Sequence, residues 1–146
     1  MTYISYNNDI DDFIDAVKNN DIKEINNMYK NGFNIHIENN YILNYAATKG
    51  KLKLLKFLVE NGGNIHNSND YPIRIASQNG HLKIVKYLIQ NGANINAENN
   101  YALNMSIKNG YLKVAKYLIE HGAIIDDNVI YYANLNERQE IIKNLI

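Results

Sequence analysis

The residues of this chain best suited to metal chemistry are its four histidines. His36 and His66 stand thirty residues apart, and the next two seats of the same repeating pattern hold Asn96 and Asp126. Imidazole is a frequent zinc ligand, so a metal interpretation is open to these two histidines. Because the seat also accepts an amide and a carboxylate, we interpret it as a polar structural position and predict neither a metal nor a cofactor.

No cluster of residues has the composition of a catalytic site. A nucleophile, acid or base must be placed together with its partners, and the sequence shows no phosphate-binding glycine loop, paired-histidine motif or nucleophile elbow. The chain has no cysteine, which excludes a thiol nucleophile and disulfides and suits a reducing compartment. We predict that the protein is not an enzyme and that it is intracellular, in the cytoplasm.

Lysines recur at two positions of the pattern and could form a basic stripe. Fifteen Lys and Arg residues balance fifteen Asp and Glu residues, so net charge favours neither nucleic acid nor an anionic membrane. A local row could still bind phosphate groups or an acidic protein. We favour a solvated helix face, partly offset by Glu60 and Glu120. The two rows are Lys53, Lys56, Lys83, Lys86, Lys113 and Lys116.

Tyr41, Tyr71 and Tyr101 form a third ladder with the same spacing. Tyrosine is enriched in binding surfaces because a rigid ring with a hydroxyl gives contact area at low entropic cost. In a shortened loop the same rings could instead pack against the neighbouring copy. We favour packing and keep recognition as the alternative.

The elements that position these side chains follow from a thirty-residue repeat, which predicts a solenoid. In the third copy, residues 73–79 are apolar on one side and predict a short inner helix. Residues 82–90 alternate apolar and lysine faces at helical spacing and predict an amphipathic outer helix. Two glycine ladders mark the helix ends: Gly50, Gly80 and Gly110, and Gly32, Gly62, Gly92 and Gly122.

Each outer helix should end at its glycine, which adopts the left-handed conformation without steric cost. Residues 94–97 then look extended. The predicted fold is therefore mainly α: a solenoid of stacked helix-turn-helix units with short extended or β-hairpin fingers.

The best copy, residues 72–97, closely resembles the ankyrin repeat. Pro72-Ile73-Arg74-Ile75-Ala76 is similar to the start of the family's Thr-Pro-Leu-His-x-Ala signature, and the turn Gly80-His81-Leu82 also matches. The family repeats at about 33 residues, so the fingers here should be shortened while the helix pairs stay intact. Tyrosine stands where the family has a capping threonine, and Asp70 or Asn100 could cap instead.

The thirty-residue units, with Asn-Gly-Ala-Asn-Ile stops and Lys-Tyr-Leu-Ile outer helices, resemble the large ankyrin families of amoeba-infecting giant viruses. We divide the chain as one ankyrin repeat domain, 1–146. It consists of an N-terminal capping repeat 1–40, central repeats 41–70, 71–100 and 101–127, and a truncated C-terminal capping repeat 128–146, whose apolar residues include Ile130, Ala133, Ile141, Ile142, Leu145 and Ile146.

The resemblance implies a non-catalytic scaffold that binds a partner protein through a concave surface of fingers and inner helices; a viral chain would act on host proteins. Carried over by position, this surface comprises Lys18, Asn19, Glu38, Asn39, Asn40, Tyr41, Thr48, Lys49, Ser68, Asn69, Asp70, Tyr71, Gln78, Asn79, Glu98, Asn99, Asn100, Tyr101, Lys108 and Asn109.

Two alternatives stay open. One is binding of nucleic acid or another acidic surface through the lysine rows. The other is an adaptor or decoy for ubiquitin ligases or asparagine hydroxylases, which the resemblance implies as partners. Asn96 is similar in position to the family's hydroxylated asparagine and is the candidate for that modification.

Overall fold

The computed structural model describes residues 3–135 and 143, with the backbone alone described at 3–8, 38 and 39. This part of the chain folds into helices joined by short turns. The helices are α1 (Tyr3–Asn19), α2 (Ile22–Lys30), α3 (Ile37–Lys49), α4 (Leu52–Glu60), α5 (Asn67–Gln78), α6 (Leu82–Gln90), α7 (Ala97–Asn109), α8 (Leu112–Glu120) and α9 (Asp127–Leu135).

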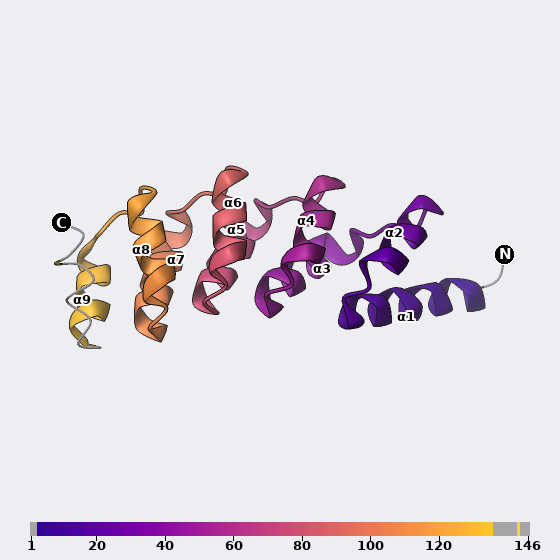
Figure 1. The fold of residues 1–146 in the computed structure, drawn as a ribbon, viewed down its shortest axis with the longest axis horizontal. Helices are drawn as coiled ribbons and strands as arrows, with labels where there is room; N and C mark the ends of the chain where they lie inside the picture. The colour runs from indigo at the N-terminus through magenta and orange to yellow at the C-terminus, as the bar shows by residue number, and fades with distance from the viewer. Residues whose placement is uncertain (1–2, 136–142, 144–146) are drawn as a thin grey trace.

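The helices pair within each unit, and the units stand side by side in one row (Figure 1). The inner helices α3, α5 and α7 pack on one another, and each also packs on its own outer helix, α4, α6 or α8. The described ends of the chain lie at opposite ends of the row. Because each unit packs on its sequence neighbours, the predicted solenoid is confirmed.

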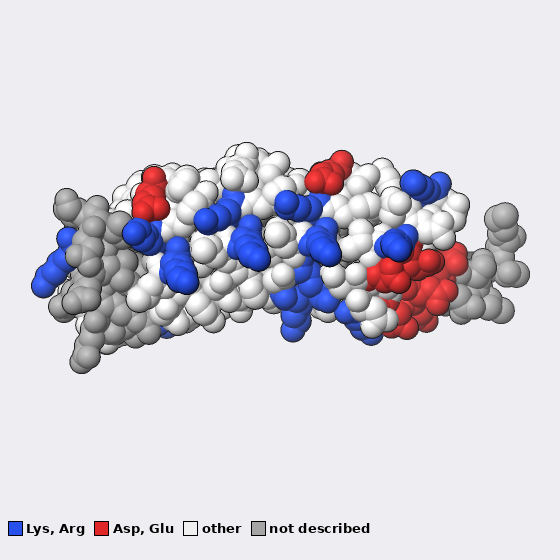
Figure 2. All heavy atoms as spheres, viewed as in Figure 1, with Lys and Arg blue, Asp and Glu red and all other residues white. Residues whose placement is uncertain are grey.

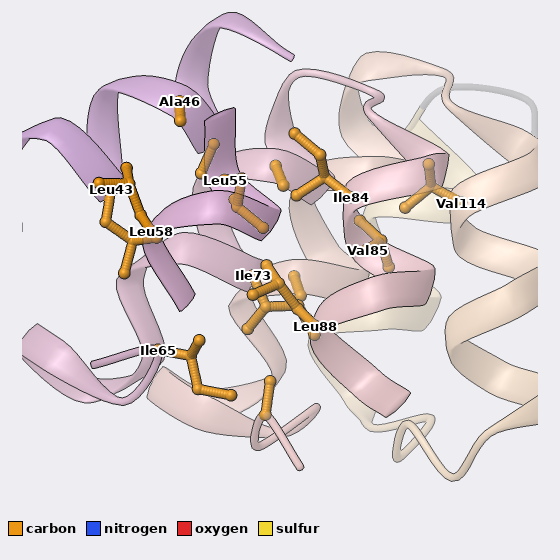
Figure 3. Packing of buried hydrophobic residues seen from close by; sticks show 14 of the residues in the cluster. Leu43, Ala46, Leu55, Leu58, Ile65, Ile73, Ile84, Val85, Leu88 and Val114 are labelled. Carbon is orange, nitrogen blue, oxygen red and sulfur yellow. The ribbon is translucent and has the colours of Figure 1, made fainter. Parts of the chain in front are cut away.

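The outer helices form because their apolar residues share one face. In α6, Ile84, Val85 and Leu88 are fully buried, whereas Lys83 and Lys86 are exposed. The equivalent residues of α4 and α8 are buried in the same way, and together with residues such as Ile73 of α5 they fill the layer between inner and outer helices (Figure 3). Each buried Leu, Ile or Val contributes roughly 1.5–3 kcal/mol relative to exposure.

Glycine ends the outer helices as predicted. Gly92 has a φ of 89° and donates its N–H to the carbonyl of Ile89 at 3.0 Å, while Ala93 donates to the carbonyl of Leu88 at 3.0 Å. This pair of bonds is the Schellman motif, which satisfies the last carbonyls of the helix. The same pattern recurs after α2, α4 and α8.

The fingers differ from the prediction, because the structure has no strand among residues 3–135. Ser68, Asn69 and Asp70 instead form a left-handed turn, with φ values of 48°, 56° and 56°. The N–H of Asp70 donates to the carbonyl of His66 at 3.4 Å across this turn. Residues 98–100 repeat the conformation. The few residues left between two helices are too short for a hairpin, so the backbone reverses in this tighter, sterically less favourable form.

The structure also corrects the predicted caps. Asp70 does not cap α5: its Oδ1 accepts from the backbone N–H of Asn94 at 2.8 Å, in the next unit. Asn100 donates from Nδ2 to Oδ2 of Asp126 at 2.6 Å. Both side chains therefore join consecutive units instead of satisfying the start of their own helix.

The C-terminal capping repeat is described only as far as α9, where Val129 and Ala133 are buried and Ile130 is exposed. Ile141, Ile142, Leu145 and Ile146 lie outside the described residues. The division into central and capping repeats remains a prediction. Among the described helices, none has the length and hydropathy needed to cross a bilayer.

Candidate partner-binding surface

The predicted concave surface falls at the two ends of the inner helices. Residues 38–41, 68–71 and 98–101 lie at the starts of α3, α5 and α7, and the other predicted residues lie at the ends of α1, α3, α5 and α7. Because α3 packs on α5 and α5 on α7, equivalent positions follow one another along the row. The scaffold therefore presents the same positions repeatedly, with different side chains at each.

Most of these side chains are accessible. Lys18, Asn19, Tyr41, Lys49, Ser68, Asn69, Glu98, Asn99, Lys108 and Asn109 are exposed, and Asn40, Thr48, Tyr71, Gln78, Asn79 and Tyr101 are half-buried. Nothing is described of the side chains of Glu38 and Asn39. Asp70 and Asn100 are the exceptions: they are only 7% and 6% exposed, so the structure places them inside the turn and not on the surface.

Several of the half-buried residues already bind within the chain. The ring of His81 bonds through Nε2 to the carbonyl of Thr48 at 2.9 Å, and Asn109 donates to the carbonyl of Gln78 at 2.8 Å. Asn79 donates to the carbonyl of Ile75 at 2.8 Å. These bonds satisfy carbonyls at the ends of the inner helices, and those of His81 and Asn109 do so across two units, so these residues help to fix the stack.

The tyrosine ladder is partly packed and partly open. Tyr101 donates its hydroxyl to Oε1 of Gln78 at 2.7 Å. The guanidinium of Arg74 lies between two rungs, with Cζ 5.4 Å from the ring centre of Tyr71 and 5.5 Å from that of Tyr101. Tyr41, by contrast, is 53% exposed. Tyr71 and Tyr101 are therefore packed within the chain, whereas the ring of Tyr41 is accessible to a partner.

Arg74 is the residue of this surface that sequence reasoning missed. Its Nε donates to the carbonyl of Asn69 at 3.0 Å and its Nη2 to that of Ser68 at 2.7 Å. The guanidinium thus binds the left-handed turn as well as the two rings. Its position three residues after Tyr71 places both on one helix face, and this spacing is the signal that could have identified it.

An open hollow of about 310 Å³ lies beside Tyr41. It is lined by Tyr41, Asn44, Tyr45 and Thr48 of α3 and by Tyr71 of α5. Its walls combine aromatic rings with an amide and a hydroxyl. Thr48 donates that hydroxyl to the carbonyl of Asn44 at 2.8 Å.

The model of the family described as ankyrin repeats (three copies) matches residues 13–99, more than half of the 146-residue chain. The chain belongs to the ankyrin repeat family. Ankyrin repeats are generally modules of protein–protein interaction, typically without catalytic activity. A comparison with curated proteins found no match.

Two of the four histidines, His36 and His81, bond to a neighbouring ankyrin unit, and His66 and His121 bond within their own unit. His36 bonds through Nε2 to the carbonyl of Asn61 at 2.8 Å, at the end of the next outer helix. His66 bonds through Nδ1 to Asp70 at 2.9 Å, and His121 to the carbonyl of Tyr117 at 2.8 Å. No group of three or more His, Asp or Glu residues in the described part of the chain is placed to hold a metal ion.

Asn96 occupies the seat of His36 two units later. Its Nδ2 donates to the carbonyl of Gly122 at 3.1 Å, and its Oδ1 accepts from the N–H of Ile124 at 2.9 Å. Both Nδ2 and Oδ1 of Asn96, just before α7, therefore bond to the backbone of the next unit. Its hydroxylation remains a prediction.

The lysine rows lie on the outer helices α4, α6 and α8 and are visible as blue pairs across the middle of Figure 2. All six lysines are exposed. The ammonium of Lys56 lies 5.3 Å from the ring centre of Tyr87, and that of Lys86 lies 5.0 Å from that of Tyr117. Burial raises the pKa of Tyr87, and the charge of Glu60 adds to the effect. Tyr87 and Tyr117 therefore link neighbouring outer helices.

Proposed function

We propose that this ankyrin repeat protein binds a partner protein through the concave surface and performs no catalysis. The observation that supports this most is the row of exposed polar side chains at the ends of the packed inner helices, together with the exposed ring of Tyr41. Side chains at these positions can vary while the buried layer stays the same. The interface would be polar and hydrated, with tyrosine as its anchor.

The partner is first identified by affinity capture from native cells followed by mass spectrometry. The test then compares two charge-reversal pairs that change net charge equally: Lys49→Glu with Lys108→Glu on the concave surface, and Lys53→Glu with Lys113→Glu on the outer helices. All four residues are exposed, and among the described residues only Lys108 of the four has a ring contact, with its ammonium 5.8 Å from the ring centre of Tyr132. Thermal unfolding of each pair therefore shows whether the fold is intact before binding is compared. We expect the concave pair to weaken binding of the purified partner. Weakening by the outer pair alone would refute the proposal.

A second candidate function is binding of a polyanion by the outer helices. Lys53, Lys83 and Lys113 favour it, because they form one exposed row and, within the described chain, make no ion pair or ring contact. Reversing the charge of all three should abolish retention of the protein on immobilised double-stranded DNA or heparin. Retention should also fall steeply with salt if phosphate or sulfate contacts carry it. Salt-insensitive retention would exclude this function.

Two further parts of the proposal concern the origin of the protein and its compartment in the cell. The thirty-residue unit and its resemblance to giant-virus repeats support a viral protein that acts on host proteins. The lack of cysteine supports the cytoplasm as its compartment. Immunofluorescence of the tagged protein in infected cells, scored for nuclear or surface staining against cytoplasmic staining, tests the second part.

A further inference from the structure

The structure shows which side chain lies between Tyr71 and Tyr101, two residues of the tyrosine ladder. The guanidinium of Arg74 lies within 5.5 Å of the ring centres of both Tyr71 and Tyr101. Cations within about 6 Å of an aromatic face are attracted by its quadrupole, and guanidinium groups also stack on the ring. The space between these two rungs is therefore occupied by a planar cation.

The preceding pair of rungs has the same frame without that cation. Thirty residues before Arg74 stands Asn44, and it lines the hollow between Tyr41 and Tyr71. Thr48 stands thirty residues before Gln78 and also lines the hollow, with a shorter side chain. The shorter Asn44 and Thr48 thus leave about 310 Å³ where the next unit holds an arginine side chain.

The unit that begins at Tyr101, the last tyrosine of the ladder, differs. Its residue equivalent to Asn44 and Arg74 is Asn104, which is only 6% exposed and donates from Nδ2 to the carbonyl of Asn99 at 3.1 Å. Asn44, by contrast, is half-buried and lines the hollow, while its Nδ2 donates to Oδ1 of Asn67 at 3.1 Å. The hollow beside Tyr41 is thus the open position.

We propose that this hollow, the arginine slot, receives an arginine side chain of the partner protein, stacked between Tyr41 and Tyr71. A volume of about 310 Å³ lies at the lower end of the range for ligand pockets, which suits one side chain better than a larger ligand. The inference rests on the proposed function, because it places one contact of the partner on the concave surface.

The slot is tested with N-acetyl-arginine amide, titrated into the full chain and followed by two-dimensional NMR. N-acetyl-citrulline amide, which has nearly the same shape without the charge, is the matched control. We expect saturable shifts at Tyr41, Tyr45 and Tyr71 with the arginine probe, at a dissociation constant in the millimolar range, about 1–10 mM. Equal shifts with citrulline, or no saturable shifts, would overturn the proposal.

Two substitutions localise the effect. Tyr41→Leu should weaken the arginine probe about two- to five-fold, the share of one ring at a partly exposed site. Tyr29→Leu removes a ring of similar exposure on α2, away from the slot, and should leave binding unchanged. Because Tyr41 is largely exposed, its replacement should not disturb folding. If both variants bind alike, the slot is not the site.

Exchanging the residues at positions 44 and 74 should change binding of the arginine probe in opposite directions. Asn44→Arg should fill the hollow as Arg74 fills the next one, and should remove binding of the probe. Arg74→Asn should open a second slot between Tyr71 and Tyr101 and raise the stoichiometry toward two. Unfolding curves for both variants show whether the fold is intact, and Tyr41→Leu decides the matter if either variant is unstable. Unchanged binding in folded Asn44→Arg would contradict the proposal.

The experiments distinguish an error in the arginine-slot proposal from an error in the proposed function. If Lys49→Glu with Lys108→Glu weakens partner binding but the probe ignores the slot, the arginine inference alone is wrong. If the probe binds the slot while partner binding responds only to the outer helices, the proposed function is wrong, and with it the role of the slot in partner recognition.

Discussion

At the residue scale, the stack depends on side chains that reach into the preceding unit. The ring of His81 lies against Gly50, where an added Cβ would come within 2.8 Å of ring atoms. The same ring bonds to the carbonyl of Thr48. Glycine at position 50 thus serves two purposes, a left-handed φ of 71° and room for the ring of the next unit.

We predict that Gly50→Ala destabilises the protein more than Gly92→Ala. Both glycines have positive φ, but a Cβ at Gly92 meets no atom within 4 Å. Gly92→Ala should therefore cost about 1 kcal/mol, the strain of a left-handed alanine. Gly50→Ala should cost at least about 1 kcal/mol more, because His81 must move. Urea unfolding of the two variants measures this, and equal losses would show that the contact is unimportant.

At the element scale, α9 has its own cap. Asp126 accepts from the N–H of Val129 at 3.0 Å. This backbone hydrogen bond lowers the pKa of the Asp126 carboxyl below its usual 3.8, and the amide of Asn100 adds to the shift. Both bonds favour the charged form, so folding and deprotonation of Asp126 support each other.

We predict that Asp126→Ala lowers stability by about 1 kcal/mol near neutral pH, as the loss of an N-cap does. A lowered folded pKa means that the ionic contribution is present above the unfolded pKa and is lost as pH falls through the folded pKa. The gap between wild type and variant should therefore narrow below about pH 4. Asp126→Asn keeps a capping oxygen but cannot titrate, and is the control. A gap that is constant with pH would contradict the assignment.

Among the helices and turns, some features could be predicted from the sequence and others could not. The helix pairs and the glycine stops at Gly92 and its equivalents are local patterns of burial and φ, so the sequence was sufficient for them. The left-handed turn at residues 68–70 was not predicted, because it depends on closing a shortened loop. Nor was the burial of Asp70, whose partner Asn94 lies in the next unit, 24 residues away.

The candidate site was predicted in a similar way. The repeat places polar side chains at fixed seats, so the exposure of Lys49, Ser68 and Lys108 could be predicted from register. Register does not say which side chain fills the space between two units. The place of Arg74 between two rings follows from the distance between rungs, which only the packed structure provides.

At the scale of the whole molecule, stability is shared between neighbours. Leu88 of α6 and Leu118 of α8 occupy the same seat and are both fully buried. Each unit packs on the units beside it, so stability is close to a sum of unit and interface contributions. A destabilising substitution in a central unit should therefore weaken its interfaces with both neighbouring units. A substitution in a unit near one end of the row should weaken mainly the units at that end.

We predict that Leu88→Ala and Leu118→Ala each cost about 2–5 kcal/mol locally but spread differently. Native-state hydrogen exchange should show lower protection throughout the chain for Leu88→Ala. For Leu118→Ala the loss should concentrate in α8 and α9 while α3 to α6 keep their protection. The same exchange pattern for both variants would mean that the row unfolds as a single block.

The central claim, that the concave surface binds the partner, is tested most directly by hydrogen exchange of the chain alone and in complex with its captured partner. The account predicts new protection at residues 68–71 and 98–101 and at the ends of α3, α5 and α7. It also predicts little change in α4, α6 and α8. Protection confined to the outer helices would contradict it.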